Sequence, residues 1–286
     1  MTQANPTTND DQFRFVSLLA LELENGDISL PSLPDVVLKI RRMLENDDCD
    51  FEQISQAISV DPVLVSRLFV FANSAYYNRA NVEIETLDGA IGRLGFEVVR
   101  NTAMSLAMKQ LYASEKHSQM ANHLRKVWAQ GMKLSCMSFA VAKTCTSRNH
   151  ETAFLCGLMH EVGKLYIITK AGEFPGLMGD KKSFDSVLEE WNGQVAKSII
   201  ESWGFSEEMA ESADPDHYLD PDPEADPKFV DIVVAAKRLL DVSADTLDEV
   251  AEEDPSFVKL GLSTAKLPDV MGAYRDKLQT MQKSLA

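Results

Sequence analysis

A helical spacing of apolar residues, repeated from segment to segment, limits the fold of this chain more than any other feature. Between residues 62 and 75, for example, the apolar side chains lie on one helical face: Leu64, Leu68, Phe71, Ala72 and Ala75. Asp61 is a suitable N-cap, and Pro62 is a suitable first helical residue. No convincing run of alternating apolar and polar residues predicts a strand. The sequence therefore predicts an all-α protein.

The same spacing predicts the order of helices along the chain. They are expected near residues 12–24, 34–46, 51–59, 62–75, 86–94, 96–112, 120–143, 150–170, 183–189, 193–203, 207–213, 228–242, 246–252 and 270–285. A polar stretch at 113–118 separates short helices from longer ones. We expect a disordered N-terminus at 1–11, two packed helical lobes at 12–115 and 116–242, and a C-terminal helical extension at 243–286. The last helix, which is amphipathic, is expected to pack on the second lobe or on another subunit.

Charge and composition exclude several classes of function. The net charge of −16 disfavours broad binding to nucleic acid or to an anionic membrane, because both require a positive surface. No apolar run reaches the roughly 20 residues that span a bilayer, so no membrane insertion is expected. The four cysteines show no CxxC spacing and are expected to be reduced. A cytoplasmic protein that binds a protein partner or a small ligand is predicted.

Four short segments of the first lobe resemble, in order and spacing, the HDOD domain. They read LPSLP at 30–34, ISVDPVL at 58–64, FANSAYY at 71–77, and AIGRLG at 90–95 followed by VVRN at 98–101. The resemblance extends over roughly residues 22–240. HDOD domains are bacterial signalling modules related to the HD superfamily of metal-dependent phosphohydrolases. The resemblance implies an N-terminal lobe, usually of five helices, packed on a second lobe with an HD-type helical core.

The signature residues of the first lobe also have architectural interpretations. Asp61 and Pro62 are typical of a helix start, and Leu94 with Gly95 is typical of a helix end. Asn73 and Ser74 lie where a helix should stop. The asparagine can adopt the left-handed conformation or bond the last carbonyls. We expect these residues to shape the lobe.

The second lobe contains an apolar run at 154–167 in which His160 precedes Glu161. Adjacent residues on a helix point about 100° apart, so this pair cannot enclose a metal ion without ligands from other helices. In active enzymes of the HD superfamily, to which the HDOD domains that the chain resembles are related, these ligands are a first His, a His-Asp pair, often further His residues and a late Asp. These residues hold one or two divalent ions that activate water.

The resemblance places other residue types at most of these positions. Gln130 stands at the first His, Asn192 at a later His and Lys237 at the late Asp, while the His-His position reads Asp216-His217. A neutral amide is a poor ligand, and a lysine opposes a cation. The residual candidates for metal binding are His160, Glu161 and His217.

The expected function is therefore non-enzymatic, as is common among the HDOD domains that the chain resembles. We expect no catalytic residue, no cofactor, and a protein partner in a signalling pathway. One alternative is an HD-type phosphohydrolase that uses Mn, Fe, Mg or Zn on a nucleotide or cyclic dinucleotide. Another is a sensor that binds a nucleotide or metabolite in the degenerate HD pocket, with Lys237 and Arg238 available for an anion.

Carboxylates elsewhere in the second lobe do not predict an active site. His150 and Glu151 are interpreted as polar residues of a first helical turn, and Glu189 with Glu190 as surface residues, since neighbours on a helix diverge.

Overall fold

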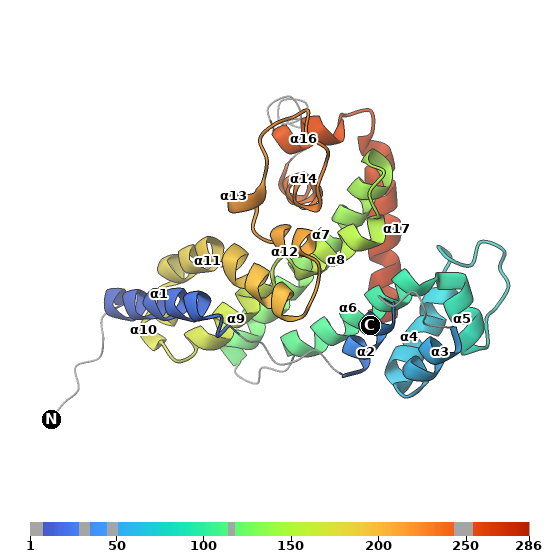
Figure 1. Ribbon diagram of the computed structural model, residues 1–286, viewed down its shortest axis with the longest axis horizontal. Helices are drawn as coiled ribbons and strands as arrows, with labels where there is room; N and C mark the ends of the chain where they lie inside the picture. The colour runs from blue at the N-terminus through green and yellow to red at the C-terminus, as the bar shows by residue number, and fades with distance from the viewer. Residues whose placement is uncertain (1–7, 29–34, 45–50, 114–117, 243–253, 286) are drawn as a thin grey trace.

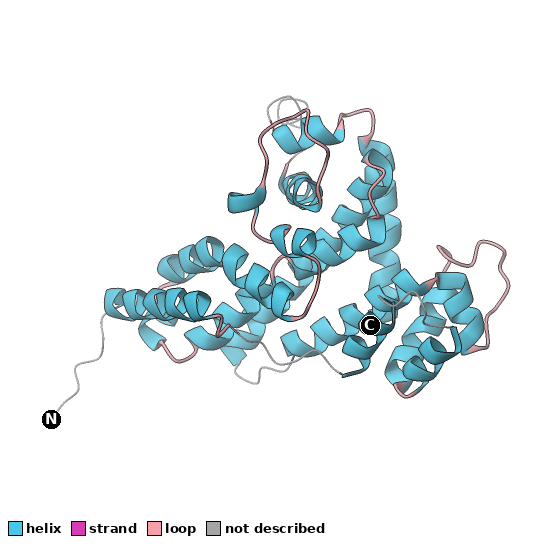
Figure 2. Ribbon diagram, viewed as in Figure 1, coloured by secondary structure: helices cyan, strands magenta, loops and turns pink. Residues whose placement is uncertain are grey.

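The computed structural model describes residues 8–28, 35–44, 51–113, 118–242 and 254–285, and within these ranges every regular element is a helix (Figure 2). The predicted all-α class is confirmed. Helices α2 to α6 pack together as the first lobe (Figure 1). They are α2 (Asp35–Leu44), α3 (Phe51–Ser59), α4 (Pro62–Ala72), α5 (Leu87–Leu94) and α6 (Phe96–Ala113).

The second lobe is built around the long helix α7, against which α8, α9 and α14 pack. Its helices are α7 (Ser118–Cys145), α8 (His150–Met159), α9 (Val162–Ala171), α10 (Pro175–Gly179), α11 (Lys181–Ser202), α12 (Glu207–Glu211), α13 (Pro215–Tyr218) and α14 (Phe229–Asp241). A short helix, α16 (Pro255–Leu260), packs on α14. Two glycines of this lobe, Gly157 in α8 and Gly163 in α9, lie very close to neighbouring helices.

The N-terminal helix departs from the predicted division of the chain. Helix α1 (Thr8–Asn25) begins at Thr8, so the expectation of disorder is wrong for residues 8–11. It packs against α10 and α11 of the second lobe, whereas the sequence assigned it to the first (Figure 1). Tyr166 and Lys170 of α9 hold it there by contacts of 2.6 and 2.9 Å to the carboxylate of Glu22.

The C-terminal helix α17 (Leu267–Leu285) connects the two lobes. It packs against α7 in the second lobe and α4 in the first, and in Figure 1 it runs from near α16 down to the first lobe. Its buried face includes Val270, Lys277, Met281 and Leu285. Of the two packing partners considered from the sequence, the structure shows the intramolecular one.

The signature residues at the helix start and end behave as predicted. Asp61 caps α4 by accepting hydrogen bonds from the backbone N–H groups of Val63 and Leu64, both at 3.0 Å. Gly95 ends α5 with φ +77°, and its N–H donates to the carbonyl of Ile91. The first segment of the resemblance, 30–34, lies outside the described residues.

Asn73 follows neither course expected for it. Its φ is −93°, so the left-handed interpretation is wrong. Its side-chain amide instead pairs with the backbone of Ile84, donating to the carbonyl at 3.0 Å and accepting from the N–H at 2.8 Å. Ser74 donates to the carbonyl of Phe71 at 2.7 Å. Asn73 thus closes the long loop between α4 and α5.

Helix limits in the second lobe differ from the prediction in two places. The single helix expected at 150–170 is broken into α8 and α9, and the two helices expected at 183–203 form one helix, α11. Tertiary packing overrides the low helix propensity of Asn192 and Gly193 there. The helix expected at 246–252 lies outside the described residues.

The helices of the described residues were compared with the length and apolarity of a membrane-spanning helix. No single helix there is long and apolar enough to cross a membrane, while α3 and α4, bent by 118°, pass the test only as a pair.

Candidate functional site

The predicted His-Glu pair lies at a break between two helices. Helix α8 ends at Met159, and Glu161, with φ −96° and ψ 10°, precedes α9. A Cβ atom at Gly157 would lie 2.7 Å from the Cα of Ser135 in α7, and one at Gly163 would lie 2.3 Å from the carbonyl oxygen of Asn192 in α11. Glycine at both positions therefore lets the two halves pack directly on neighbouring backbones.

Side chains from other helices satisfy the backbone groups at this break. The amide of Asn192 donates to the carbonyl of His160 at 2.9 Å and accepts from the N–H of Lys164 at 3.0 Å. The hydroxyl of Tyr112 in α6 donates to the carbonyl of Glu161 at 3.2 Å. The resemblance predicts a degenerate ligand position at Asn192, and in the structure both polar atoms of its amide bond the backbone.

His160 is buried, and its Nδ1 lies 3.3 Å from the carbonyl oxygen of Ser212. Burial lowers the pKa of His160 to about 4, although the charge of Glu161 opposes this shift. The imidazole is therefore neutral at neutral pH. It has the backbone contact expected of a core histidine.

The carboxylate of Glu161 is held by two lysines. Lys164 Nζ lies 2.7 Å from Oε2, and Lys237 Nζ lies 3.8 Å from Oε1. Burial alone would raise the pKa of Glu161, but His160, Lys164 and Lys237 together lower it below its usual value. The carboxylate is thus ionised, and ammonium groups lie where a metal would bind it.

These groups open onto a pocket of about 610 Å³. Residues from α7, α9, α11, α14 and α17 contribute to its walls, among them Gln130, Lys133, Glu161, Lys164, Glu189 and Lys237. Three lysines and three carboxylates contribute to its lining, namely Lys133, Lys164, Lys237, Glu161, Glu189 and Asp241. We call this cavity the lysine pocket.

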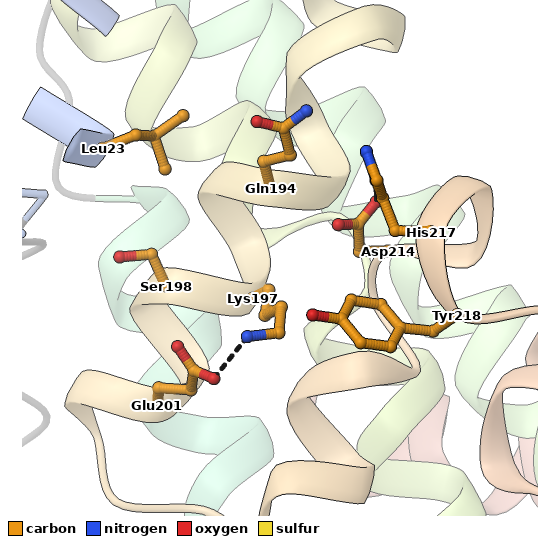
Figure 3. A pocket seen from close by; sticks show the side chains of 8 residues that line it. All are labelled: Leu23, Gln194, Lys197, Ser198, Glu201, Asp214, His217 and Tyr218. Atoms are coloured by element: carbon orange, nitrogen blue, oxygen red, sulfur yellow. Dashed lines mark hydrogen bonds and ion pairs between the residues drawn. The ribbon is translucent and has the colours of Figure 1, made fainter. Parts of the chain in front are cut away.

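His217 lies in a different pocket, of about 370 Å³, which Figure 3 shows. Its Nδ1 is 3.0 Å from Asp214 Oδ1, and this hydrogen bond raises the pKa of His217. Nearby, Lys197 pairs with Glu201 at 2.5 Å. The residual metal set of His160, Glu161 and His217 is thus not gathered in one pocket, because Asp214 holds the imidazole beside α11.

The residues present do not fit a metal centre of the HD type. Over the ranges that the structure describes, no group of three or more His, Cys, Asp or Glu residues is placed to hold an ion. Gln130 is exposed at the edge of the lysine pocket, Asn192 is used by the backbone, and Lys237 adds a positive charge.

Comparison of the sequence with known protein families identifies the family of this chain. A model of the HDOD domain matches residues 30–218. This chain belongs to the HDOD domain family. An uncharacterised protein of Treponema pallidum (strain Nichols) is 26% identical over 148 residues, which are 51% of this chain and 28% of that protein. The match therefore spans less than a third of the relative's length.

Solved structures share the fold of this HDOD protein. A "putative metal-dependent phosphohydrolase" from Shewanella amazonensis SB2B has a TM-score of 0.79 at 22% identity, with 94% of this chain and 99% of that chain covered. An HDOD domain protein with unknown function from Geobacter sulfurreducens has a TM-score of 0.69 at 20% identity, covering 96% and 99%. At such identities the likeness shows the fold alone.

The sequence did not indicate the contacts that four charged residues of this HDOD protein make, namely Glu151, Lys164, Glu189 and Arg238. Glu151 lies in the first turn of α8 as predicted, but its side chain is buried against Lys277, which the sequence did not indicate. Glu189 is exposed as expected, but it contacts Lys164, which was not singled out although it follows Glu161 by one helical turn. Arg238 pairs with Asp254, with 3.4 Å between Nε and Oδ2, and it does not line the lysine pocket. An anion in that pocket would therefore contact Lys237 but not Arg238.

Proposed function

We propose that this HDOD protein is a non-enzymatic regulatory component of bacterial signal transduction that acts by binding a protein partner or a small ligand. One observation carries the proposal. The carboxylate at the HD position, Glu161, is neutralised by Lys164 and Lys237. A divalent cation entering the site would meet two ammonium groups and only a single buried carboxylate. The net charge of −16 further supports a protein or small-molecule partner over nucleic acid, and a cytoplasmic location remains part of the proposal.

Metal analysis together with an activity assay tests the proposal. The purified chain is incubated with Mn²⁺, Fe²⁺, Mg²⁺ or Zn²⁺, freed of unbound ion, and measured for metal content and for hydrolysis of a cyclic dinucleotide and of bis(p-nitrophenyl) phosphate. We expect no stoichiometric metal and no turnover. One or two ions per chain, with turnover lost in Glu161→Gln, would establish the phosphohydrolase alternative.

The second candidate function is sensing of a nucleotide or metabolite in the lysine pocket. Its volume of about 610 Å³ lies within the range of small-molecule sites, and Lys133, Lys164, Lys237 and Tyr274 contribute to its walls. A ligand that binds the folded state raises the unfolding temperature in a saturable manner. Such stabilisation by one compound, unchanged by chelator, would support this candidate.

A further inference from the structure

Lys164 is shared between two carboxylates of very different exposure. Its side chain is 8% exposed, and its Nζ lies 2.7 Å from Glu161 and 2.6 Å from Glu189. Glu161 is 6% exposed at its side chain, whereas Glu189 is 66% exposed. The two contacts therefore join one buried ammonium to an interior carboxylate and to a carboxylate in solvent.

The interior contact and the solvent contact differ in strength. Separating Lys164 from Glu161 would leave the buried carboxylate with only the 3.8 Å contact to Lys237, which is unfavourable in the interior. The contact with Glu189 is open to water, and ion pairs of that kind stabilise a protein by only about 0–1 kcal/mol. Glu189 is thus the exchangeable partner of Lys164.

We propose that Glu189 occupies the place of an anionic group of the ligand, and that the lysine pocket binds a small molecule whose phosphate or carboxylate displaces Glu189 from Lys164. This inference rests on the second candidate function. The chemistry of the ligand follows from the chemistry of the group it replaces, since an ammonium that binds one carboxylate binds other oxyanions by the same charge-assisted hydrogen bonds.

The remaining charges of the pocket are consistent with an anion. When Glu189 is displaced, Lys133, Lys164 and Lys237 face Glu161 and Asp241, so the lining has one positive charge in excess. Lys237 is 44% exposed at its side chain and lies 3.8 Å from Glu161, which leaves its ammonium able to turn toward a ligand.

Two further lining residues supply neutral contacts. Gln130 is exposed at the opening and can donate through its amide, and Tyr274 projects from α17 with both a ring and a hydroxyl. The ring gives a ligand an apolar face to stack on, as in many small-molecule sites. The pocket thus combines charged and aromatic recognition.

Titration calorimetry of the full chain with sodium phosphate and with malonate, at constant ionic strength, tests the inference and separates the two oxyanion sources. Removing the competing carboxylate in Glu189→Gln is expected to tighten binding by roughly 2- to 5-fold, equivalent to the loss of an exposed ion pair. Lys237→Ala is expected to weaken binding by a similar factor.

Glu190→Gln is the matched control, because Glu190 is the neighbouring exposed carboxylate on α11 and points about 100° away. An equal gain in both variants would reveal a general charge effect and overturn the inference, as would no binding of either anion. If neither anion binds and no metal-dependent turnover is found, the proposed regulatory function still holds, with a protein as the binding partner. Metal-dependent turnover would overturn that proposal separately.

Discussion

The ammonium of Lys277 in α17 lies 2.9 and 3.0 Å from the two carboxylate oxygens of Glu151 in α8, and both side chains are buried. Asn101 of α6 donates to the same carboxylate at 2.7 Å. The rings of Phe139 and Phe154 lie 4.2 and 4.9 Å from the ammonium, within the range of a cation–π contact. This buried ion pair thus connects the C-terminal helix to the place where α6 meets α8.

Loss of this ammonium should destabilise the whole chain. Lys277→Ala leaves the Glu151 carboxylate buried without its counter-charge, and breaking a buried pair in this way costs about 3–5 kcal/mol. We expect a reduction of that size in the free energy of unfolding, measured in urea by circular dichroism.

Arg275→Ala is the control for this experiment, because Arg275 lies on the exposed side of the same helix and should change the free energy by less than about 0.5 kcal/mol. The double variant Lys277→Met with Glu151→Met should be closer to the wild type than either single variant, since it removes both charges. Equal stability of Lys277→Ala and Arg275→Ala would show that the pair contributes nothing.

This ion pair also shows where prediction from sequence stops. Asp61 and Gly95 were predicted correctly because a cap acts on residues within one turn of it. The partner of Glu151 is 126 residues away in the chain. A glutamate in a first helical turn looks the same in sequence whether solvent or a distant lysine faces it.

The break between α8 and α9 at His160 and Glu161 could not be predicted from the sequence for a related reason. The run at 154–167 is apolar throughout and continues a helical spacing. The chain is interrupted because Asn192 and Tyr112, from two other helices, bond the backbone groups that the break releases. The resemblance identified His160 and Glu161 as the HD position, while their geometry depended on contacts that no local pattern contains.

The close approach of α9 and α11 gives a second prediction. In Gly163→Ala the new methyl group would meet the carbonyl oxygen of Asn192 at 2.3 Å, so one helix must shift. Overpacking of this kind costs typically 1–3 kcal/mol. We expect the melting temperature to fall by several degrees in differential scanning calorimetry.

Gly92 on α5 has free space around it, in contrast to Gly163. A Cβ atom there meets nothing within 4 Å, and alanine is favoured over glycine within a helix by roughly 0.5–1 kcal/mol. Gly92→Ala should therefore raise the melting temperature slightly. If both variants shifted it in the same direction, steric contact at Gly163 would not be the cause.

The amide of Asn192 gives a third prediction. Asn192→Asp preserves shape and the acceptor for the N–H of Lys164, but it places a carboxylate oxygen against the carbonyl of His160. Loss of the buried hydrogen bond should reduce the free energy of unfolding by about 1–3 kcal/mol. Gln194→Glu makes the same chemical change at an exposed position of α11 and should have little effect. Similar losses in both variants would mean that added charge on α11, rather than the break, is responsible.

The two histidines of the residual metal set, His160 and His217, should have pKa values on opposite sides of the ordinary histidine value of 6.5. Burial lowers the pKa of His160 to about 4, while the hydrogen bond to Asp214 raises that of His217 above 6.5. In nuclear magnetic resonance titrations, the ring protons of His217 should shift above pH 6.5, and those of His160 should stay unchanged down to about pH 5.

The same shift determines how stability depends on pH. The unfolded chain binds a proton at His160 near pH 6.5, whereas the folded chain does so only near pH 4. The contribution of this residue to stability is therefore complete above about pH 6.5 and is lost as the pH falls toward 4. In His160→Gln the loss of stability between pH 6.5 and pH 4 should be smaller than in the wild type. An identical pH dependence in both proteins would mean that His160 is protonated as readily in the folded chain as in the unfolded one.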